Sequence, residues 1–130
     1  MMVRPLVFNM IQGLHHAQIT IPLHAEAQAR EFYCNFLGLP EVEKPASLQG
    51  RGGFWLQVGH LSVHVGVEDG IERKRTKAHL AYLVSDLEWW RLQLIHKNIK
   101  PEDGIPIPGF VRFEFRDPFG NRVEFIQLID

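Results

Sequence analysis

The sequence has few of the features that mark secreted, membrane or nucleic-acid-binding proteins. It holds a single cysteine, Cys34, which excludes a disulfide within the chain. No apolar run approaches the length of a transmembrane helix. The formal net charge is −1, which argues against a general nucleic-acid binder. Residues 1–12 lack the long apolar region and the small-residue cleavage site of a signal peptide. We therefore expect a cytoplasmic protein that binds neither nucleic acid nor a membrane.

The length and composition are typical of one globular domain with its own core. The chain has 130 residues, of which 45% are hydrophobic and 22% are charged. The sequence divides into two similar parts, residues 14–67 and residues 78–128, joined by a charged linker. Each part alone would have a marginal core. We therefore expect both modules to form a single domain over residues 14–128, preceded by an N-terminal extension over residues 1–13.

The two parts show the same order of predicted elements. Strands are indicated by alternation of apolar and polar residues, and helices by apolar residues three or four positions apart. The predicted strands cover residues 14–21, 41–43, 54–58, 60–67, 78–84, 111–115 and 122–128, and the predicted helices cover residues 25–37 and 87–98. The loop over residues 100–109 leaves room for one short strand. The chain is therefore predicted to be an α+β protein in which a βαβββ module occurs twice.

Three local signals refine this outline. Ser85 and Glu88 fit a capping box at the start of the second helix. The glycine-rich residues 46–53 are typical of a mobile loop. The run from Asp117 to Gly120, Asp-Pro-Phe-Gly, predicts a turn before the last strand.

Potential metal ligands stand at equivalent places in the two parts. His16 and His79 lie 63 positions apart near the starts of their modules, and His64 and Glu124 lie 60 positions apart near the module ends. Strand parity puts all four on the face opposite the apolar, helix-facing side chains. Imidazoles and a carboxylate suit a divalent cation such as zinc, nickel, iron, manganese or cobalt. His16, His79 and Glu124 could supply three ligands, and His64 could be a fourth ligand or a base beside them.

Among these residues, Glu124 has the clearest physical reason to be a metal ligand. It stands in an otherwise apolar strand, where a carboxylate is costly without a cation or hydrogen bonds. The remaining histidines lack such an argument and are interpreted as ordinary structural or surface residues: His15, His24, His60 and His96.

These segments together resemble the vicinal oxygen chelate superfamily, which includes glyoxalase I, fosfomycin-resistance proteins, methylmalonyl-CoA epimerase, extradiol dioxygenases and bleomycin-resistance proteins. The resemblance covers about residues 14–128. Its most specific part is the run from Asp117 to Glu124, Asp-Pro-Phe-Gly-Asn-Arg-Val-Glu. The other matching segments are residues 16–21, 29–33, 37–39 and 79–86. The resemblance implies a cupped mixed β-sheet around a metal ion, with the helices on its outer face.

The ligands of this superfamily fall residue by residue onto the sequence. Its first-strand histidine corresponds to His16, its second-module histidine to His79 and its last-strand glutamate to Glu124. The remaining position is a glutamate in glyoxalase I, where it belongs to the acid/base apparatus, and it is His64 here. This departure weighs against the glyoxalase reaction itself. Fosfomycin-resistance proteins use only the three-ligand set, which this chain retains.

The resemblance implies a divalent-metal-dependent, glyoxalase-like enzyme that acts on a small oxygenated metabolite through oxygens bound to one metal ion. Glu124 and His64 are the candidate catalytic residues, and Glu114 is a weaker candidate base. The candidate substrate contacts are Gln18, Thr20, Arg51, Arg112 and Arg122.

Two other functions remain open on the same residues. An extradiol-type ring-cleaving dioxygenase would hold Fe(II) with the same two histidines and glutamate. A metal-free binder of the bleomycin-resistance kind would instead sequester a ligand in an aromatic cleft. In relatives of this length a homodimer is usual, and the metal site can take ligands from both chains.

Overall fold

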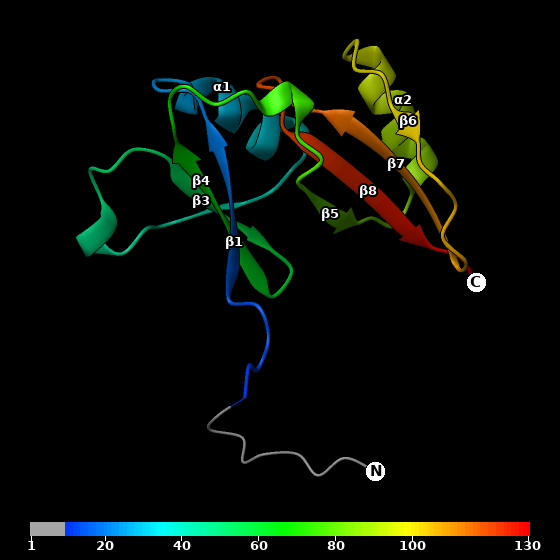
Figure 1. The fold of residues 1–130 in the computed structure, drawn as a ribbon, viewed down its shortest axis with the longest axis horizontal. Coiled ribbons are helices and arrows are strands. Elements are labelled where there is room, and N and C mark those ends of the chain that lie inside the picture. Colours follow the sequence, from blue (N-terminus) through cyan, green and yellow to red (C-terminus); the bar gives the residue numbers. More distant parts are fainter. Residues whose placement is uncertain (1–9) are drawn as a thin grey trace.

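The computed structural model describes residues 10–130, and within them the chain forms two βαβββ modules in tandem (Figure 1). The first nine residues of the predicted N-terminal extension lie outside the described part. Module one contains β1 (His16–Ile21), α1 (Glu26–Arg30), the π-helical segment Glu31–Phe36, β2 (Glu41–Val42), β3 (Phe54–Val58) and β4 (Leu61–Val67). Module two contains β5 (His79–Leu83), α2 (Leu87–His96), β6 (Glu102–Asp103), β7 (Phe110–Arg116) and β8 (Arg122–Leu128). The predicted α+β class and the duplicated element order are confirmed.

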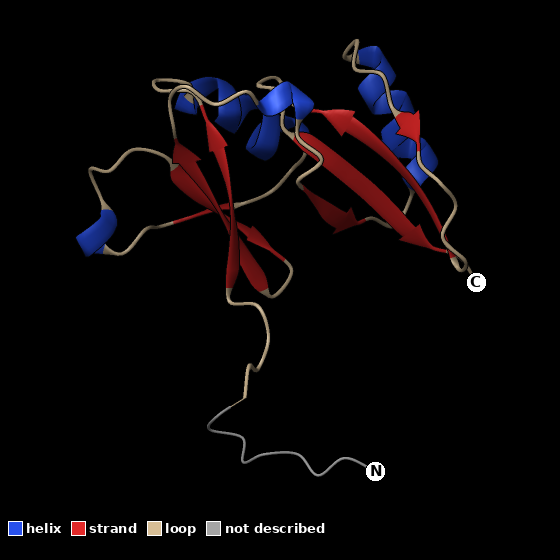
Figure 2. Cartoon of the chain, in the orientation of Figure 1, coloured by secondary structure: helices blue, strands red, loops and turns tan. Residues whose placement is uncertain are grey.

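The strands form two four-stranded mixed sheets of identical topology (Figure 2). The strand orders are β1-β4-β3-β2 and β5-β8-β7-β6. In each sheet the first and last strands of the module pair in parallel, and the other neighbours pair antiparallel. The cupped sheet expected from the family is therefore divided within one chain. β1 and β5 are each the edge strand of a separate sheet.

One face of each sheet packs under helices, and the residues there form a shared core. Val63 and Val65 of β4 and Phe113 and Phe115 of β7 are buried, whereas their strand neighbours point to the other face. The helical segment of module one also reaches module two, because its Phe32 ring lies 6.4 Å from the ring of Phe115. Buried side chains of both modules consequently belong to one hydrophobic cluster.

The Asp117 turn is a structural junction between the modules. The hydroxyl of Tyr33 donates to Oδ2 of Asp117 at 2.6 Å, and the side chain of Asn121 donates to the backbone oxygen of Thr20 at 2.9 Å. Within the turn, the amides of Phe119 and Asn121 donate to Oδ1 of Asp117. The most specific motif of the sequence therefore shapes a turn and joins the two halves. The predicted turn over residues 117–120 is confirmed by the Gly120-to-Asp117 backbone hydrogen bond of 3.1 Å.

Some local predictions need correction. The capping box of Ser85 and Glu88 is wrong: Asp86 is the N-cap of α2, and its Oδ1 accepts from the amide of Trp89 at 3.1 Å. The Glu88 carboxylate instead accepts from Arg91. The helix ends at His96, since Asn98 adopts a left-handed backbone with φ of 60°.

Two segments hold more regular structure than the sequence indicated. The loop over residues 46–53 contains a 3₁₀ turn, Ala46–Leu48. The linker contains another, Arg73–Arg75. Among the described residues, no helix combines the length and apolar character needed to cross a bilayer.

Candidate metal centre

The open face of the first sheet carries two of the four candidate ligands. The β1–β4 register pairs His16 with Ser62 and Gln18 with His64, so these side chains share the face away from the helices. Trp55 of β3 pairs with His64 and joins this face. Strand parity in residues 54–58 could have located Trp55, because its neighbours Phe54 and Leu56 are the buried ones.

The ring of His64 is held in a stack of three aromatic rings. It lies parallel to the indole of Trp55 with ring centroids 3.8 Å apart, and its other face meets the ring of His16 at 4.1 Å. Its Nε2 atom lies 3.2 Å from the hydroxyl oxygen of Ser62. Burial lowers the pKa of His64, and the neighbouring imidazoles His16 and His15 lower that pKa further. A fixed, neutral imidazole therefore stands beside His16.

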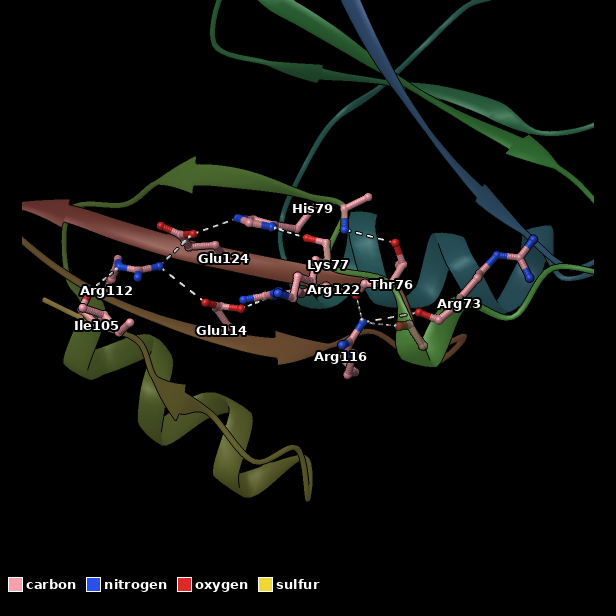
Figure 3. A network of polar contacts seen from close by, with 12 residues as sticks. Arg73, Thr76, Lys77, His79, Ile105, Arg112, Glu114, Arg116, Arg122 and Glu124 are labelled. Atoms are coloured by element: carbon pink, nitrogen blue, oxygen red, sulfur yellow. Dashed lines mark hydrogen bonds and ion pairs between the residues drawn. The ribbon is translucent and has the colours of Figure 1, made fainter. Parts of the chain in front are cut away.

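The other two candidate ligands meet on the open face of the second sheet (Figure 3). His79 of β5 and Glu124 of β8 lie on neighbouring parallel strands, with Nε2 of His79 3.0 Å from Oε1 of Glu124. The Nδ1 atom of His79 lies 2.8 Å from the backbone oxygen of Lys77. A carbonyl oxygen can only accept a hydrogen bond, so Nδ1 carries the proton. Nε2 is then the ring nitrogen that faces the carboxylate, and it pairs with Glu124.

A network of charged groups surrounds Glu124, which is only 5% exposed. The Arg112 guanidinium donates to Oε1 of Glu124 at 3.2 Å, and it also donates to Glu114 and to the backbone oxygen of Ile105. Glu114 also accepts a hydrogen bond from the guanidinium of Arg122. This hydrogen bond holds the pKa of Glu114 below its ordinary value. The buried Glu124 and the half-buried Glu114 are thus compensated by arginines.

The residues predicted to contact a substrate lie in three different places. Arg112 and Arg122 both contact Glu114 on the same face as Glu124 (Figure 3). Thr20 accepts from the buried Arg73 guanidinium at 3.1 Å, at the junction of the modules. Arg51 and Gln18 instead line a cavity on the first sheet. Arg73, which had no sequence signal, holds the linker against β1 through the backbone oxygens of Thr20 and Glu68.

Within one chain, the four candidate ligands are divided into two pairs. His16 and His64 lie on the first sheet, and His79 and Glu124 lie on the second. Among residues 10–130, no three His, Cys, Asp or Glu side chains converge in a way that could hold a metal ion. The division follows from the topology, since β1 and β5 are edge strands of different sheets. Within one chain, His16 therefore stands on a different sheet from His79 and Glu124.

Comparison with known proteins identifies the family. The family model of the Glyoxalase/Bleomycin resistance protein/Dioxygenase superfamily matches residues 13–125. The chain belongs to this superfamily. A search of curated proteins found no match.

Solved structures agree with the superfamily fold. A protein assigned to the glyoxalase family from Bacillus anthracis is 37% identical, with a TM-score of 0.84 over 93% of this chain and 98% of that one. The genomically encoded fosfomycin resistance protein FosX from Listeria monocytogenes is 17% identical, with a TM-score of 0.71 over 89% and 91% of the two chains. A FosX variant complexed with Mn(II) and 1S,2S-dihydroxypropylphosphonic acid is 15% identical, with a TM-score of 0.73 over 92% and 95%. The FosX likenesses establish the fold alone.

Proposed function

We propose that this superfamily member is a divalent-metal-dependent, glyoxalase-like enzyme that acts on a small oxygenated metabolite through metal-bound oxygens. The observation that carries the proposal is the approach of His79 Nε2 to Glu124 Oε1 at 3.0 Å. With Nδ1 of His79 committed to a backbone oxygen, Nε2 is the nitrogen left to bind a cation, and it faces a carboxylate oxygen. A cation between such donors satisfies both.

The donor set fits a divalent cation. Imidazole nitrogens and a carboxylate bind zinc, nickel, iron, manganese and cobalt, and His79 has the carbonyl partner that typically orients a metal-binding ring. Glu124 is buried, so an added positive charge beside it would offset its desolvation. Mn(II) in the FosX complex supports manganese as one metal to test.

The third ligand, His16, would come from a second copy of the chain. β1 and β5 are edge strands, and each carries one of the two candidate histidines. A homodimer that brings the first sheet of one copy against the second sheet of the other would join His16 to His79 and Glu124. Such isologous contacts generate two equal sites by symmetry. We also propose that the enzyme is cytoplasmic.

The chain's own residues supply the remaining chemistry. A bound divalent cation would act as a Lewis acid on a substrate oxygen. His64, held between Trp55 and His16, would act as a base: its neutral ring would accept a proton from the substrate. Glu124 would hold the cation, while Arg112 orients the carboxylate. The stack fixes the direction of His64, which favours proton transfer over a fourth ligand role.

Elemental analysis tests the proposal. The protein is stripped with EDTA, reloaded separately with Mn(II), Zn(II), Co(II), Ni(II) or Fe(II), and freed of excess metal. We expect about one ion per chain, as a three-ligand site predicts. His79→Ala should lose the ion, and His96→Ala, at an exposed site on α2, should keep it. Wild-type protein without stoichiometric metal would overturn the proposal in favour of a metal-free binder.

Oxygen uptake with a catechol by the Fe(II) form would indicate the dioxygenase reaction instead.

A further inference from the structure

A cavity of about 260 Å³ opens on the first sheet next to His64. Its floor is the open face of β1, β3 and β4, and its wall is the loop that contains the 3₁₀ turn Ala46–Leu48. The cavity is slightly smaller than the range of about 300–1,000 Å³ for pockets that hold drug-sized molecules. It therefore suits a small polar substituent of a substrate.

The ionisable groups on the cavity wall are cationic. Lys44 and Arg51 line it, and no aspartate or glutamate is among its lining residues. Glu26 lies beside the lining residue Gly52, where its carboxylate accepts from the Gly53 amide at 3.2 Å, and Glu41 pairs with Arg30 at 2.8 Å. The ammonium of Lys44 donates to the backbone oxygen of Gly52 at 2.9 Å, which holds it at the cavity. An ammonium has three donors, so Lys44 keeps others for a ligand.

The floor of the cavity adds a neutral hydrogen-bonding group. Gln18 lies over Gly66, where a Cβ atom would stand 2.4 Å from the Gln18 Nε2 atom. The φ angle of Gly66 is not in the left-handed region, and a side chain there would displace the end of Gln18 from this position. The absent side chain of Gly66 lets the Gln18 amide occupy the cavity floor beside Trp55 and His64.

The cavity adjoins the proposed metal centre through a single ring. His64 lines the cavity, and its other face stacks on His16 at 4.1 Å. We propose that Lys44 and Arg51, with Gln18, form an anion-binding subsite, and that the substrate carries a carboxylate or a phosphate-like group seated there. The assignment of the anion to the substrate rests on the proposed function. The subsite itself stands on the cavity and its charges. Oxyanions are the ligands that guanidinium and ammonium groups bind with charge-assisted hydrogen bonds.

Trp55 provides a direct probe of this subsite. Full-length, ¹⁵N-labelled protein stripped with EDTA is titrated with inorganic phosphate, and separately with malonate, at constant ionic strength and pH 7.5. The three tryptophans give three indole resonances, and Trp55→Phe assigns the one at the cavity. We expect a saturable shift of the Trp55 resonance only, because Trp89 and Trp90 lie on α2 in the other module. Tighter binding of phosphate points to a phosphate-like substituent, and tighter binding of malonate to a carboxylate.

Charge-matched variants make the test specific. Arg51→Gln and Lys44→Gln should each raise the apparent Kd about five- to tenfold, the effect expected from losing one partly solvated charged contact. Arg75→Gln removes an exposed cation of the linker and should change the Kd less than about twofold. Backbone resonances report that each variant is folded.

The outcomes separate this inference from the proposed function. A Trp55 resonance that does not respond, or an equal effect of Arg51→Gln and Arg75→Gln, overturns the anion subsite while stoichiometric metal leaves the enzyme proposal intact. Saturable phosphate binding that depends on Arg51, in protein that takes up no metal, supports the subsite and overturns only the metal-dependent function.

Discussion

Nε2 of His79 and Oε1 of Glu124 lie 3.0 Å apart on two neighbouring parallel strands, β5 and β8. The strand register fixes this approach, because Ala81 is the partner of Glu124 and His79 lies on the same face two residues earlier. His16 stands on the other sheet, where its ring stacks on that of His64 at 4.1 Å. The pair of His79 and Glu124 is therefore half of the proposed centre, and the other half requires a second copy.

Mixing two defective variants tests this shared arrangement. His16→Ala and His79→Ala should each lose metal as homodimers. After the two are unfolded together and refolded, each mixed dimer would contain one site with both changes and one intact site. With random pairing, about a quarter of all sites should bind metal again, as measured by elemental analysis.

The control for the mixing experiment joins His79→Ala with Glu124→Gln. Both changes affect the same module, so every site in the mixed dimer keeps one defect and metal should stay absent. Recovery in this control, or no recovery with His16→Ala, would contradict a site shared between chains.

Glu114 should influence metal affinity without being a ligand. Glu114→Gln removes the carboxylate between Arg112 and Arg122, which raises the positive charge near Glu124 and loosens the Arg112 contact. We expect the affinity for Mn(II) to fall about tenfold, the lower end for losing a group behind a metal ligand. Isothermal titration calorimetry measures the change. Glu88→Gln alters a 73% exposed carboxylate on α2 and should leave the affinity unchanged. Equal affinities in the two variants would remove Glu114 from the centre.

Alternating strand patterns predicted much of this fold. The last predicted strand, residues 122–128, coincides with β8, and parity placed Glu124 on the face away from the buried Val123 and Phe125. Parity assigns a side chain to a face, but it does not determine which sheet or which chain lies opposite that face. For this reason the sequence indicated that His16 and His79 were equivalent without revealing that they stand on separate sheets.

Other features depend on contacts between distant segments. The Asp117 run was recognised as a turn, but its hydrogen bond to Tyr33, 84 positions away, requires the packed modules. The cap of α2 was misassigned by one residue because Ser85 and Asp86 are both good capping residues, and only the backbone decides between them. The anion cavity likewise arises where a loop folds over the sheet and brings Lys44 and Arg51 to Gln18.

The Tyr33–Asp117 hydrogen bond should contribute to global stability. Tyr33→Phe removes a buried donor, while Asp117 keeps the contacts from its own turn. We expect the free energy of unfolding to fall by about 1–2 kcal/mol in urea denaturation. Tyr82→Phe is the matched control, since its hydroxyl has no hydrogen bond within residues 10–130, and it should cost less. The reverse order would show that Tyr33 does not join the modules through this bond.

The two tyrosines should also govern stability at high pH. Burial raises the pKa of Tyr82 to about 12, and burial with the nearby Asp117 raises the pKa of Tyr33 well above its ordinary value. Because the folded pKa exceeds the unfolded value of about 10, this contribution is complete below pH 10 and is lost as the pH rises towards 12. Each tyrosine should make the loss steeper by up to about 1.4 kcal/mol per pH unit. Urea titrations between pH 9 and 12 measure it, and Tyr82→Phe should flatten the slope. Tyrosinate absorbance that develops in native protein near pH 10 would contradict the raised pKa values.

Gly53 should be the least replaceable of the positive-φ glycines in module one. Its φ is 76°, and a Cβ atom there would stand 2.1 Å from the backbone oxygen of Val65. Gly53→Ala therefore combines backbone strain with a clash against a strand that cannot yield easily, and we expect a loss of about 3 kcal/mol or more of unfolding free energy. Gly59→Ala has a φ of 58° but nothing within 4 Å of the added atom, so strain alone should cost about 1 kcal/mol. Thermal and urea denaturation of the two variants separate the cost of backbone strain from the cost of the clash with Val65. Equal losses would mean that backbone strain, and not the close approach of residues 53 and 65, sets the requirement for glycine.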